Sequence, residues 1–253
     1  MSQSNREQLR RNQAAQAQQK RLTRIIGVGA AVLVVVLIGV FVAVLVQNQA
    51  HTVTASASAA TPPNATASKD GIVVNPGKAT AGAPVVELFF DYQCPVCKQF
   101  EGAYGASLKS LAASGAIELH YRNMTFLDIN LNNDASLRAG IGAVCSDFAG
   151  KYSDYHDQLY ANQPAKEGDG YTDELLSTTI PATVGITGAD LTSFQACYKD
   201  QTTKAFVQGT NDSASKAGVN ATPSVHVNGK DLPLQTIAGV QPDGLGDLIK
   251  KNA

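Results

Sequence analysis

The sequence contains few residues of the kinds that commonly bind metals: four cysteines and four histidines among 253 residues. Cys94 and Cys97 form one Cys-x-x-Cys box, whereas Cys145 and Cys197 each stand alone. A structural zinc site takes four ligands, usually from two closely spaced Cys or His pairs. Because no second close pair accompanies the box, the spacing argues against zinc and favours a redox-active disulfide.

A strong excess of one charge is also missing, since the formal net charge is −1. Such a balance gives no indication of nucleic-acid binding. The charge is unevenly placed, however, because Glu7 is the only acidic residue before position 25. The same stretch carries basic residues at Arg6, Arg10, Arg11, Lys20, Arg21 and Arg24.

A nearly continuous apolar run extends from Ile25 to Val46. Its roughly 22 residues are enough for a helix to cross a membrane, and they exceed the apolar segment of a cleavable export signal. We therefore predict a transmembrane signal anchor at 25–46, with residues 1–24 as a cytoplasmic basic tail. A cleaved export signal is the alternative, because Ala55-Ser56-Ala57 offers a cleavage pattern. In both cases the Cys box is exported.

Export places the cysteines where disulfides persist, and four cysteines make two pairs without remainder. Residues 47–69 are rich in Ala, Thr, Ser and Pro, which predicts a flexible tether. The folded domain is then expected over residues 70–253. The sequence thus predicts a single-pass protein of the cell membrane whose catalytic domain is extracytoplasmic.

The pattern around the box predicts a strand followed by a helix. Residues 84–91 form an apolar run, and residues 94–114 carry apolar side chains at three- and four-residue spacing. Cys94 thereby falls at a helix N-terminus, where unpaired N–H groups and the helix dipole favour a thiolate. Pro95 suits the first helical position because its fixed φ is already helical. We expect Cys94 to be the attacking thiol and Cys97 to be the resolving thiol.

Further strands are predicted at 71–74 and 117–124, the second of them parallel to the strand at 84–91. From 133 to 217 the pattern predicts an inserted helical subdomain with helices at 135–148, 152–160, 172–179, 190–198 and 203–216. Thr172 and Asp190 are the expected N-caps. Asn228-Gly229 predicts a hairpin between 224–227 and 230–233, and a helix at 242–251 closes the chain.

Cys145 and Cys197 fall in the first and fourth of these helices. A disulfide between them would close a loop of about 53 residues and stabilise the subdomain by about 4 kcal/mol on the chain-entropy account. We expect a structural disulfide here. The alternatives are a second redox pair and two buried thiols.

Taken together, these elements resemble the thioredoxin fold. The resemblance rests on residues 87–101 around the Cys-Pro-Val-Cys box and on Ala221-Thr222-Pro223-Ser224 before the hairpin. It is similar in particular to the DsbA-like thiol:disulfide oxidoreductases of bacterial envelopes, in their membrane-anchored actinobacterial form. Over residues 71–253 it implies an α/β thioredoxin fold with an inserted α-helical subdomain and no cofactor. It also implies that Pro223 is cis and that Thr222 and Pro223 form the substrate-docking edge.

Two features bear on what the resemblance implies. Strongly oxidising members of the family have His between the cysteines, whereas Pro95 and Val96 supply no charge here, so we expect a less oxidising disulfide. Many members also keep a buried carboxylate below the resolving cysteine. Glu87 inside the central strand and Asp91 at its end are the candidates for this proton relay, and a surface-facing Glu87 is the alternative.

The resulting interpretation is an oxidase that forms disulfides in exported polypeptides through Cys94 and Cys97. The resemblance implies a membrane partner that reoxidises it, such as a vitamin K epoxide reductase homologue. A disulfide reductase or isomerase of the same fold is the first alternative. The second is a copper-binding module that uses the two box cysteines and His226, although a half-exposed strand histidine also accounts for His226.

Overall fold

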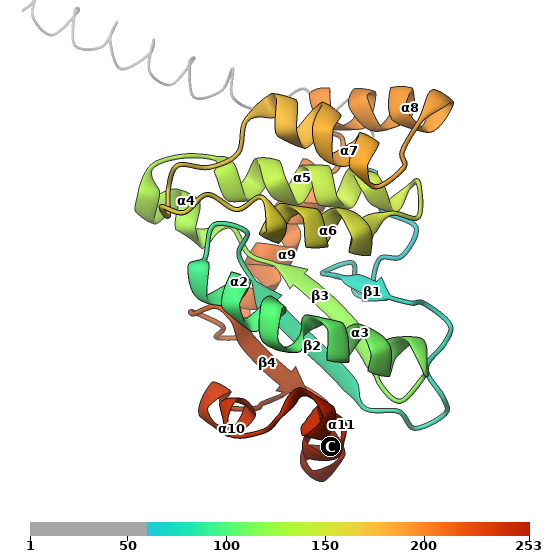
Figure 1. The fold of residues 1–253 in the computed structure, drawn as a ribbon, viewed down its shortest axis with the longest axis vertical. Coiled ribbons are helices and arrows are strands. Elements are labelled where there is room, and N and C mark those ends of the chain that lie inside the picture. Colours follow the sequence, from blue (N-terminus) through green and yellow to red (C-terminus); the bar gives the residue numbers. More distant parts are fainter. Residues whose placement is uncertain (1–59) are drawn as a thin grey trace, which may run out of the picture. The chain divides into compact units, whose positions relative to one another are not determined.

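A computed structural model describes residues 60–253 (Figure 1). The expected basic tail (1–24), the expected anchor (25–46) and the first part of the expected tether (47–59) lie outside the described residues. Across residues 60–253, no helix combines the length and the apolar character needed to cross a membrane.

A five-stranded mixed sheet lies at the centre of the domain. Its strands are β1 (Ile72–Val74), β2 (Val85–Phe90), β3 (Glu118–Asn123), β4 (Ser224–Val227) and β5 (Lys230–Asp231). Their order is β1-β3-β2-β4-β5, with β2 and β3 parallel and the other neighbours antiparallel. The predicted parallel strand–helix–strand unit is therefore confirmed.

The two faces of β2 have different surroundings, because successive side chains of a strand point to opposite sides. Val86, Leu88 and Phe90 belong to the main hydrophobic core. Phe89 belongs to a smaller cluster with Ala214 of α9 (Lys204–Lys216), so α9 covers the opposite face. Figure 1 shows this arrangement, with α3 in front of the sheet and α9 behind it.

The helical segment after the box runs from Pro95 to Ala113 without a break. It consists of α2 (Pro95–Phe100), the π-helical turn η1 (Glu101–Gly105) and α3 (Ala106–Ala113). The predicted helix at 94–114 is confirmed, but its apolar spacing did not indicate the wider turn. Turns of this kind occur frequently at functional sites.

The helical subdomain is stacked at one end of the sheet (Figure 1). Its helices are α4 (Phe126–Leu131), α5 (Ala135–Asp147), α6 (Tyr152–Ala161), η2 (Leu175–Thr179), α7 (Ile180–Thr183) and α8 (Gly188–Lys199). The helix α4 was not predicted. The predicted insertion to residue 217 is too long, because α9 packs against β3 as well as against α5.

Two predicted helix boundaries in this subdomain are wrong. The predicted helix at 172–179 does not end before Pro181, because η2 runs directly into α7, which contains this proline. Asp190 is not an N-cap, because α8 already begins at Gly188 with Thr187 as its cap. Thr172 does act as expected, and its hydroxyl accepts a hydrogen bond from the Leu175 N–H at 3.2 Å.

Residues 60–69 pack against the domain, so the tether prediction extends too far. The Ala60 N–H donates to the Thr202 carbonyl at 3.0 Å. The backbone and side-chain amides of Asn64 both donate to the Asp147 carboxylate, at 2.9 and 2.8 Å. The sequence did not reveal this because the segment is held by hydrogen bonds and carries little apolar side-chain surface. The domain therefore begins before Asp70.

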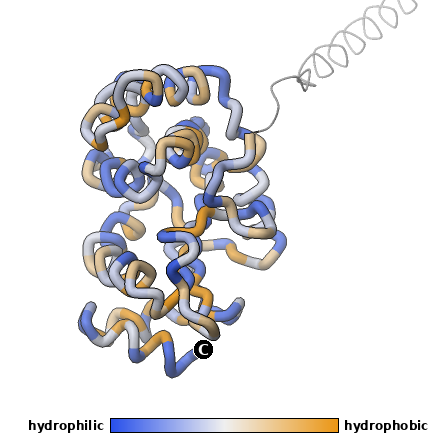
Figure 2. The backbone as a smooth tube through the Cα atoms, turned by 90° about the vertical axis from the view of Figure 1, so that its right-hand side faces the viewer, coloured by the Kyte–Doolittle hydropathy of each residue, from blue (hydrophilic) through white to orange (hydrophobic). Residues whose placement is uncertain are grey.

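The C-terminal part adds the hairpin and closing helices. Asn228 and Gly229 have φ of +48° and +78°, the left-handed pair that a tight hairpin turn requires, and the hairpin is confirmed. After it come α10 (Leu234–Ala238), which was not predicted, the 3₁₀ turn η3 (Pro242–Gly244) and α11 (Leu245–Asn252). Figure 2 shows hydrophobic stretches running through the interior of the domain, in agreement with the buried strand residues.

Candidate active site

The Cys-x-x-Cys box opens the helix α2, as the sequence predicted. Cys94 is the N-cap of α2 and Pro95 lies in its first turn. The Cys94 Sγ accepts a hydrogen bond from the Cys97 N–H at 3.4 Å. Both are free thiols, exposed by 6 % and 1 %, while Val96 between them is 51 % exposed. A partner can therefore reach Cys94 across Val96, but Cys97 is enclosed.

The two thiols differ in acidity. The pKa of Cys94 is lowered to about 6, chiefly because the Cys97 thiol donates a hydrogen bond to its thiolate. The N–H groups of Cys97 and Val96 stabilise the same charge, and burial opposes them. The pKa of Cys97 is raised well above the ordinary value, first by burial, then by the hydrogen bond that its thiol donates to Cys94, and then by the charge on Cys94. Cys94 is therefore a thiolate at neutral pH and Cys97 a thiol.

The segment Thr222-Pro223 faces the box, although Thr222 lies 128 residues after Cys94 in the sequence. The peptide bond between the two residues is cis, as the resemblance implied. The Cys94 Sγ lies 3.5 Å from the Thr222 carbonyl oxygen, to which it donates a hydrogen bond when it is protonated. The Thr222 side chain also lowers the pKa of Cys94, after the larger effects of the Cys97 contacts. The segment thus borders the reactive sulfur.

Asp91 is buried at the end of β2 and connects the box to the helical subdomain. Its carboxylate accepts hydrogen bonds from the Ser136 hydroxyl at 2.5 Å, the Gln93 N–H at 2.9 Å and the Leu127 N–H at 3.3 Å. Burial nevertheless raises the pKa of Asp91 to about 7. The carboxylate is thus occupied by donors of the loop, α4 and α5. Its role as a proton relay stays a prediction.

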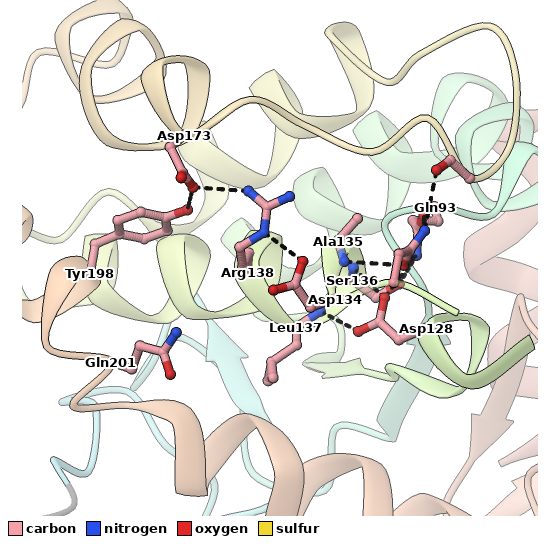
Figure 3. Close-up of polar contacts among 12 residues, drawn as sticks. Gln93, Asp128, Asp134, Ala135, Ser136, Leu137, Arg138, Asp173, Tyr198 and Gln201 are labelled. Atoms are coloured by element: carbon pink, nitrogen blue, oxygen red, sulfur yellow. Dashed lines mark hydrogen bonds and ion pairs between the residues drawn. The ribbon is translucent and has the colours of Figure 1, made fainter. Parts of the chain in front are cut away.

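Gln93, directly before Cys94, extends this connection. Its side-chain Nε2 lies 2.8 to 3.0 Å from oxygens of Asp128, Asn133 and Ser136. Figure 3 shows Gln93 beside Asp128 and Ser136. Asp128 in turn accepts from the N–H groups of Ser136 and Leu137 at the start of α5, at 2.8 and 2.9 Å. Sequence reasoning missed Asp128 because it caps α5 from eight residues away.

A second group of residues, which were not predicted from the sequence, holds the backbone of the box by hydrogen bonds. The Gln163 side chain donates to the carbonyls of Tyr92 and Cys94 at 2.8 and 3.0 Å, and the Tyr171 hydroxyl donates to the same Tyr92 carbonyl at 2.7 Å. Both come from the segment that follows α6. This segment lies between the predicted helices at 152–160 and 172–179, and no local pattern in its sequence indicates the contact.

Glu87 does not lie beside the sulfurs, and its prediction as a proton relay is wrong. It is ion-paired with Arg122, which also contacts Asp70 at 2.6 Å. Burial raises the pKa of Asp70, but hydrogen bonds from Arg122, Ser68 and Thr66 outweigh burial and hold it below the usual range. Glu87 shares its side of β2 with Phe89, the face that α9 covers. Alternation along the strand therefore points it away from the core that holds Cys97.

His226 lies on the same face as Glu87, opposite it in the register of β2 and β4. Its ring packs on Phe89 with centroids 4.8 Å apart, and its Nε2 lies 4.0 Å from the Asp231 carboxylate. Among residues 60–253, no three His, Cys, Asp or Glu side chains are grouped closely enough to hold a metal ion. The structure therefore does not bring His226 together with the box as a third ligand.

A disulfide joins Cys145 of α5 to Cys197 of α8. Cys145 is buried, and the hydroxyls of Thr203 and Thr202 lie 3.6 Å from its Sγ and 3.2 Å from the Cys197 Sγ, respectively. The bridge ties two helices of the subdomain together. Its contribution to stability stays a prediction.

Comparison with known proteins agrees with this geometry. The family model described as Thioredoxin matches residues 74–251. The chain is 28 % identical over 155 residues to the "Probable disulfide bond formation protein D" of Bacillus cereus, covering 60 % of this chain and 68 % of that protein.

Solved structures show the same fold. The thiol-disulfide oxidoreductase MdbA of Corynebacterium diphtheriae matches with a TM-score of 0.60 and 17 % identity, covering 76 % of this chain and 94 % of that one. The reduced DsbA of Mycobacterium tuberculosis matches with a TM-score of 0.58 and 24 % identity, covering 72 % and 92 %.

Proposed function

The chain belongs to the thioredoxin family and is a thiol-disulfide oxidoreductase, and on that premise we propose that it forms disulfides in exported proteins. The observation that carries the proposed direction is the pKa of Cys94, lowered to about 6. A stabilised thiolate is a good leaving group and favours the reduced form of the enzyme, so the oxidised form readily gives its disulfide away.

The reaction proceeds in two exchanges. A substrate thiolate attacks the Cys94 Sγ, the Cys94–Cys97 bond breaks, and the Cys97 sulfur leaves with its electron pair and takes up a proton. A second substrate thiolate then attacks the substrate sulfur of this mixed disulfide and releases Cys94 as a thiolate. The substrate loses two electrons and the enzyme gains them. The enclosed Cys97 is shielded from substrate, which directs the first attack to Cys94.

Thr222 and Pro223 are the proposed docking edge for the substrate. The Thr222 carbonyl already lies against Cys94, so an extended substrate backbone that pairs with this segment would bring its own sulfur to the reactive one. Val96, exposed beside Cys94, offers apolar contact next to the same place.

The proposed location is the outer side of the cell membrane. The apolar run 25–46 and the basic residues before it support a signal anchor with the described domain outside. The exchange leaves a dithiol, so the enzyme requires a reoxidising partner. We assign this role to a quinone-linked membrane protein of the vitamin K epoxide reductase type, which could regenerate the disulfide at the membrane surface.

The test mixes the full chain, oxidised at Cys94 and Cys97, with a reduced unfolded protein that contains two cysteines. We expect one substrate disulfide per enzyme molecule, counted by mass spectrometry after alkylation. The Cys94→Ser variant is the control and should form none. If the wild-type protein left the substrate reduced, and its dithiol form instead reduced substrate disulfides, the reductase alternative would replace the oxidase.

A further inference from the structure

The segment 163–171, which follows α6, lies against the turn that leads into the box. Gln163 in this segment is buried, and its side-chain amide donates to the Tyr92 carbonyl at 2.8 Å and to the Cys94 carbonyl at 3.0 Å. The Tyr171 hydroxyl donates to the same Tyr92 carbonyl at 2.7 Å. We call the side chains of Gln163 and Tyr171 the carbonyl clamp. The two exchanges of the proposed reaction do not use either of them.

The chemistry of this contact fixes how the Gln163 amide is oriented. Both groups that face it are carbonyl oxygens, which accept hydrogen bonds and donate none. The side-chain NH₂ group has two protons, and the two carbonyls use both of them. A side chain of the same size without N–H donors would leave the Cys94 carbonyl with its helical partner, the Lys98 N–H at 3.3 Å. Gln163 is therefore matched to this place by its two donors.

The segment that carries the clamp is itself held in place. The Asn133 side chain donates to the Gly168 carbonyl at 3.2 Å. Gly170 has φ of +67° and approaches the first residue of α5 so closely that a side chain at this position would collide with it. The Lys98 ammonium, on the helix that the box opens, donates to the Gln163 carbonyl at 3.2 Å. The segment is thus fixed by α5 on one side and by α2 on the other.

Cys94 is the residue whose conformation the clamp controls. As the N-cap of α2 it has extended backbone angles, φ of −75° and ψ of 117°, and it precedes the first helical turn. Hydrogen bonds within the helix do not fix the chain on its N-terminal side. The clamp holds one carbonyl before Cys94 and the carbonyl of Cys94 itself. Because side-chain direction depends on the backbone angles, the clamp also determines where the Cys94 sulfur points.

The position of this sulfur decides which donors reach it. The pKa of Cys94 is lowered first by the Cys97 thiol, and the N–H groups of Cys97 and Val96 and the Thr222 side chain lower it further. Hydrogen bonds weaken steeply when they lengthen or bend, and the field of a helix terminus falls off within one turn. The stability of the thiolate therefore depends on how firmly the first turn of α2 is held.

We propose that Gln163 is a positioning residue for Cys94, with Tyr171 supporting one of the two carbonyls that Gln163 holds. The clamp keeps the first turn of α2 where its N–H groups converge on the Cys94 sulfur. The helical subdomain thereby takes part in setting the reactivity of a thiol that lies outside it. This role rests on the thiol exchange proposed above and holds for either direction of electron flow.

The test measures the pKa of Cys94 in the reduced full chain from thiolate absorbance across pH. Gln163→Met keeps the size of the side chain and removes both N–H donors. We expect the pKa to rise by about one unit, within the range that lost hydrogen bonds to a charged group produce. It should stay below the ordinary value of 9.0, because the Cys97 thiol and Thr222 still act on the sulfur.

The same variant should also change the equilibrium with glutathione. A less stable thiolate stabilises the dithiol form less. Oxidation of the dithiol by glutathione disulfide at neutral pH should therefore become about fivefold more favourable in Gln163→Met than in the wild type. A purely structural role of Gln163 would lower the free energy of unfolding and leave both the pKa and this equilibrium unchanged.

Asn162→Leu is the matched control. Asn162 is the exposed neighbour of Gln163, and its side-chain amide also donates to a backbone carbonyl, that of Gln158 at 2.8 Å. This variant removes the same kind of hydrogen bond away from the box, so its Cys94 pKa should equal that of the wild type. A folded Gln163→Met protein with the wild-type pKa, or an equal shift in Asn162→Leu, would overturn the proposal. Exchange by the wild-type protein reports the function separately, so failure of the clamp is distinct from failure of the function.

Should Gln163→Met fail to fold, Tyr171→Phe provides a second measurement. It removes one hydroxyl, keeps the ring and leaves Gln163 as the donor to the Tyr92 carbonyl. The pKa of Cys94 should then rise in the same direction but by less, about half a unit. A folded Tyr171→Phe protein with the wild-type pKa would contradict the role of the clamp.

Discussion

The two cysteine pairs of this chain show how surroundings determine what sulfur does. Cys94 and Cys97 lie three residues apart at a helix N-terminus, where N–H groups and the Cys97 thiol stabilise one thiolate. Cys145 and Cys197 lie 52 residues apart, in the last turns of the two helices α5 and α8. The first pair is prepared to react, and the second is placed to hold α5 against α8.

Asymmetry within the reactive pair follows from the same contrast. Cys94 borders Thr222 and the exposed Val96, whereas Cys97 is enclosed by the core and has a raised pKa. Cys94 is therefore the sulfur that reacts with substrate, and Cys97 remains a protonated thiol. The disulfide at Cys145 has no such division of roles.

Replacing a reactive cysteine should have the largest effect, because it removes the chemistry that distinguishes the first pair from the second. Cys94→Ser removes the only thiolate that substrate can reach, so exchange should fall to the uncatalysed background. Cys97→Ser leaves the nucleophile but removes the resolving thiol, so mixed disulfides at Cys94 should accumulate. Non-reducing gels and mass spectrometry of trapped species distinguish the two outcomes. Trapping at Cys97 in the Cys94→Ser variant would contradict the assignment of roles.

Removing the second pair should affect stability and leave the chemistry intact. The double variant Cys145→Ala with Cys197→Ala frees a long loop in the unfolded chain, so the free energy of unfolding should fall by about 4 kcal/mol. Urea denaturation measures the loss, and exchange rates of the folded variant should stay within about twofold of wild type. A folded variant without turnover would show that this pair belongs to the redox circuit.

The pKa of Cys94 gives a prediction in pH. Thiolate absorbance of the reduced protein should show a midpoint near pH 6 that disappears in Cys94→Ser. Because this pKa is lowered from 9.0 to about 6 on folding, the stability that the thiolate contributes is complete above pH 9 and is lost as the pH falls to 6. An unfolding curve of the dithiol form without that loss would contradict the shift.

The smallest expected effect comes from replacing Val96, the residue beside Cys94 in the box. Val96 is half-exposed, so Val96→His should fold normally and place a partial positive charge beside Cys94. The pKa of Cys94 should then fall by about one unit, and the disulfide should become more oxidising. Val96→Gln is the uncharged polar control and should shift the pKa less. Equal shifts in the two variants would show that charge is not the cause.

Local patterns in the sequence predicted those features of the fold that depend on a few neighbouring residues. Cys94-Pro95 at a helix start and Asn228-Gly229 at a hairpin turn are confirmed, because each depends on backbone geometry over a few residues. The contacts of Gln163 and Asp128 with the box were not predicted, since each joins segments that are distant in sequence. The misassigned Glu87 illustrates the same limit, because its partner Arg122 lies on another strand.

The most direct test of the account is the reduction potential of the Cys94–Cys97 pair in the full chain, measured against glutathione buffers. Because the lowered pKa of Cys94 stabilises the dithiol form, we expect a potential on the oxidising side of thioredoxin's, in the direction of the known disulfide donors. A value near that of thioredoxin, about −270 mV, would contradict the oxidase and assign the protein to disulfide reduction.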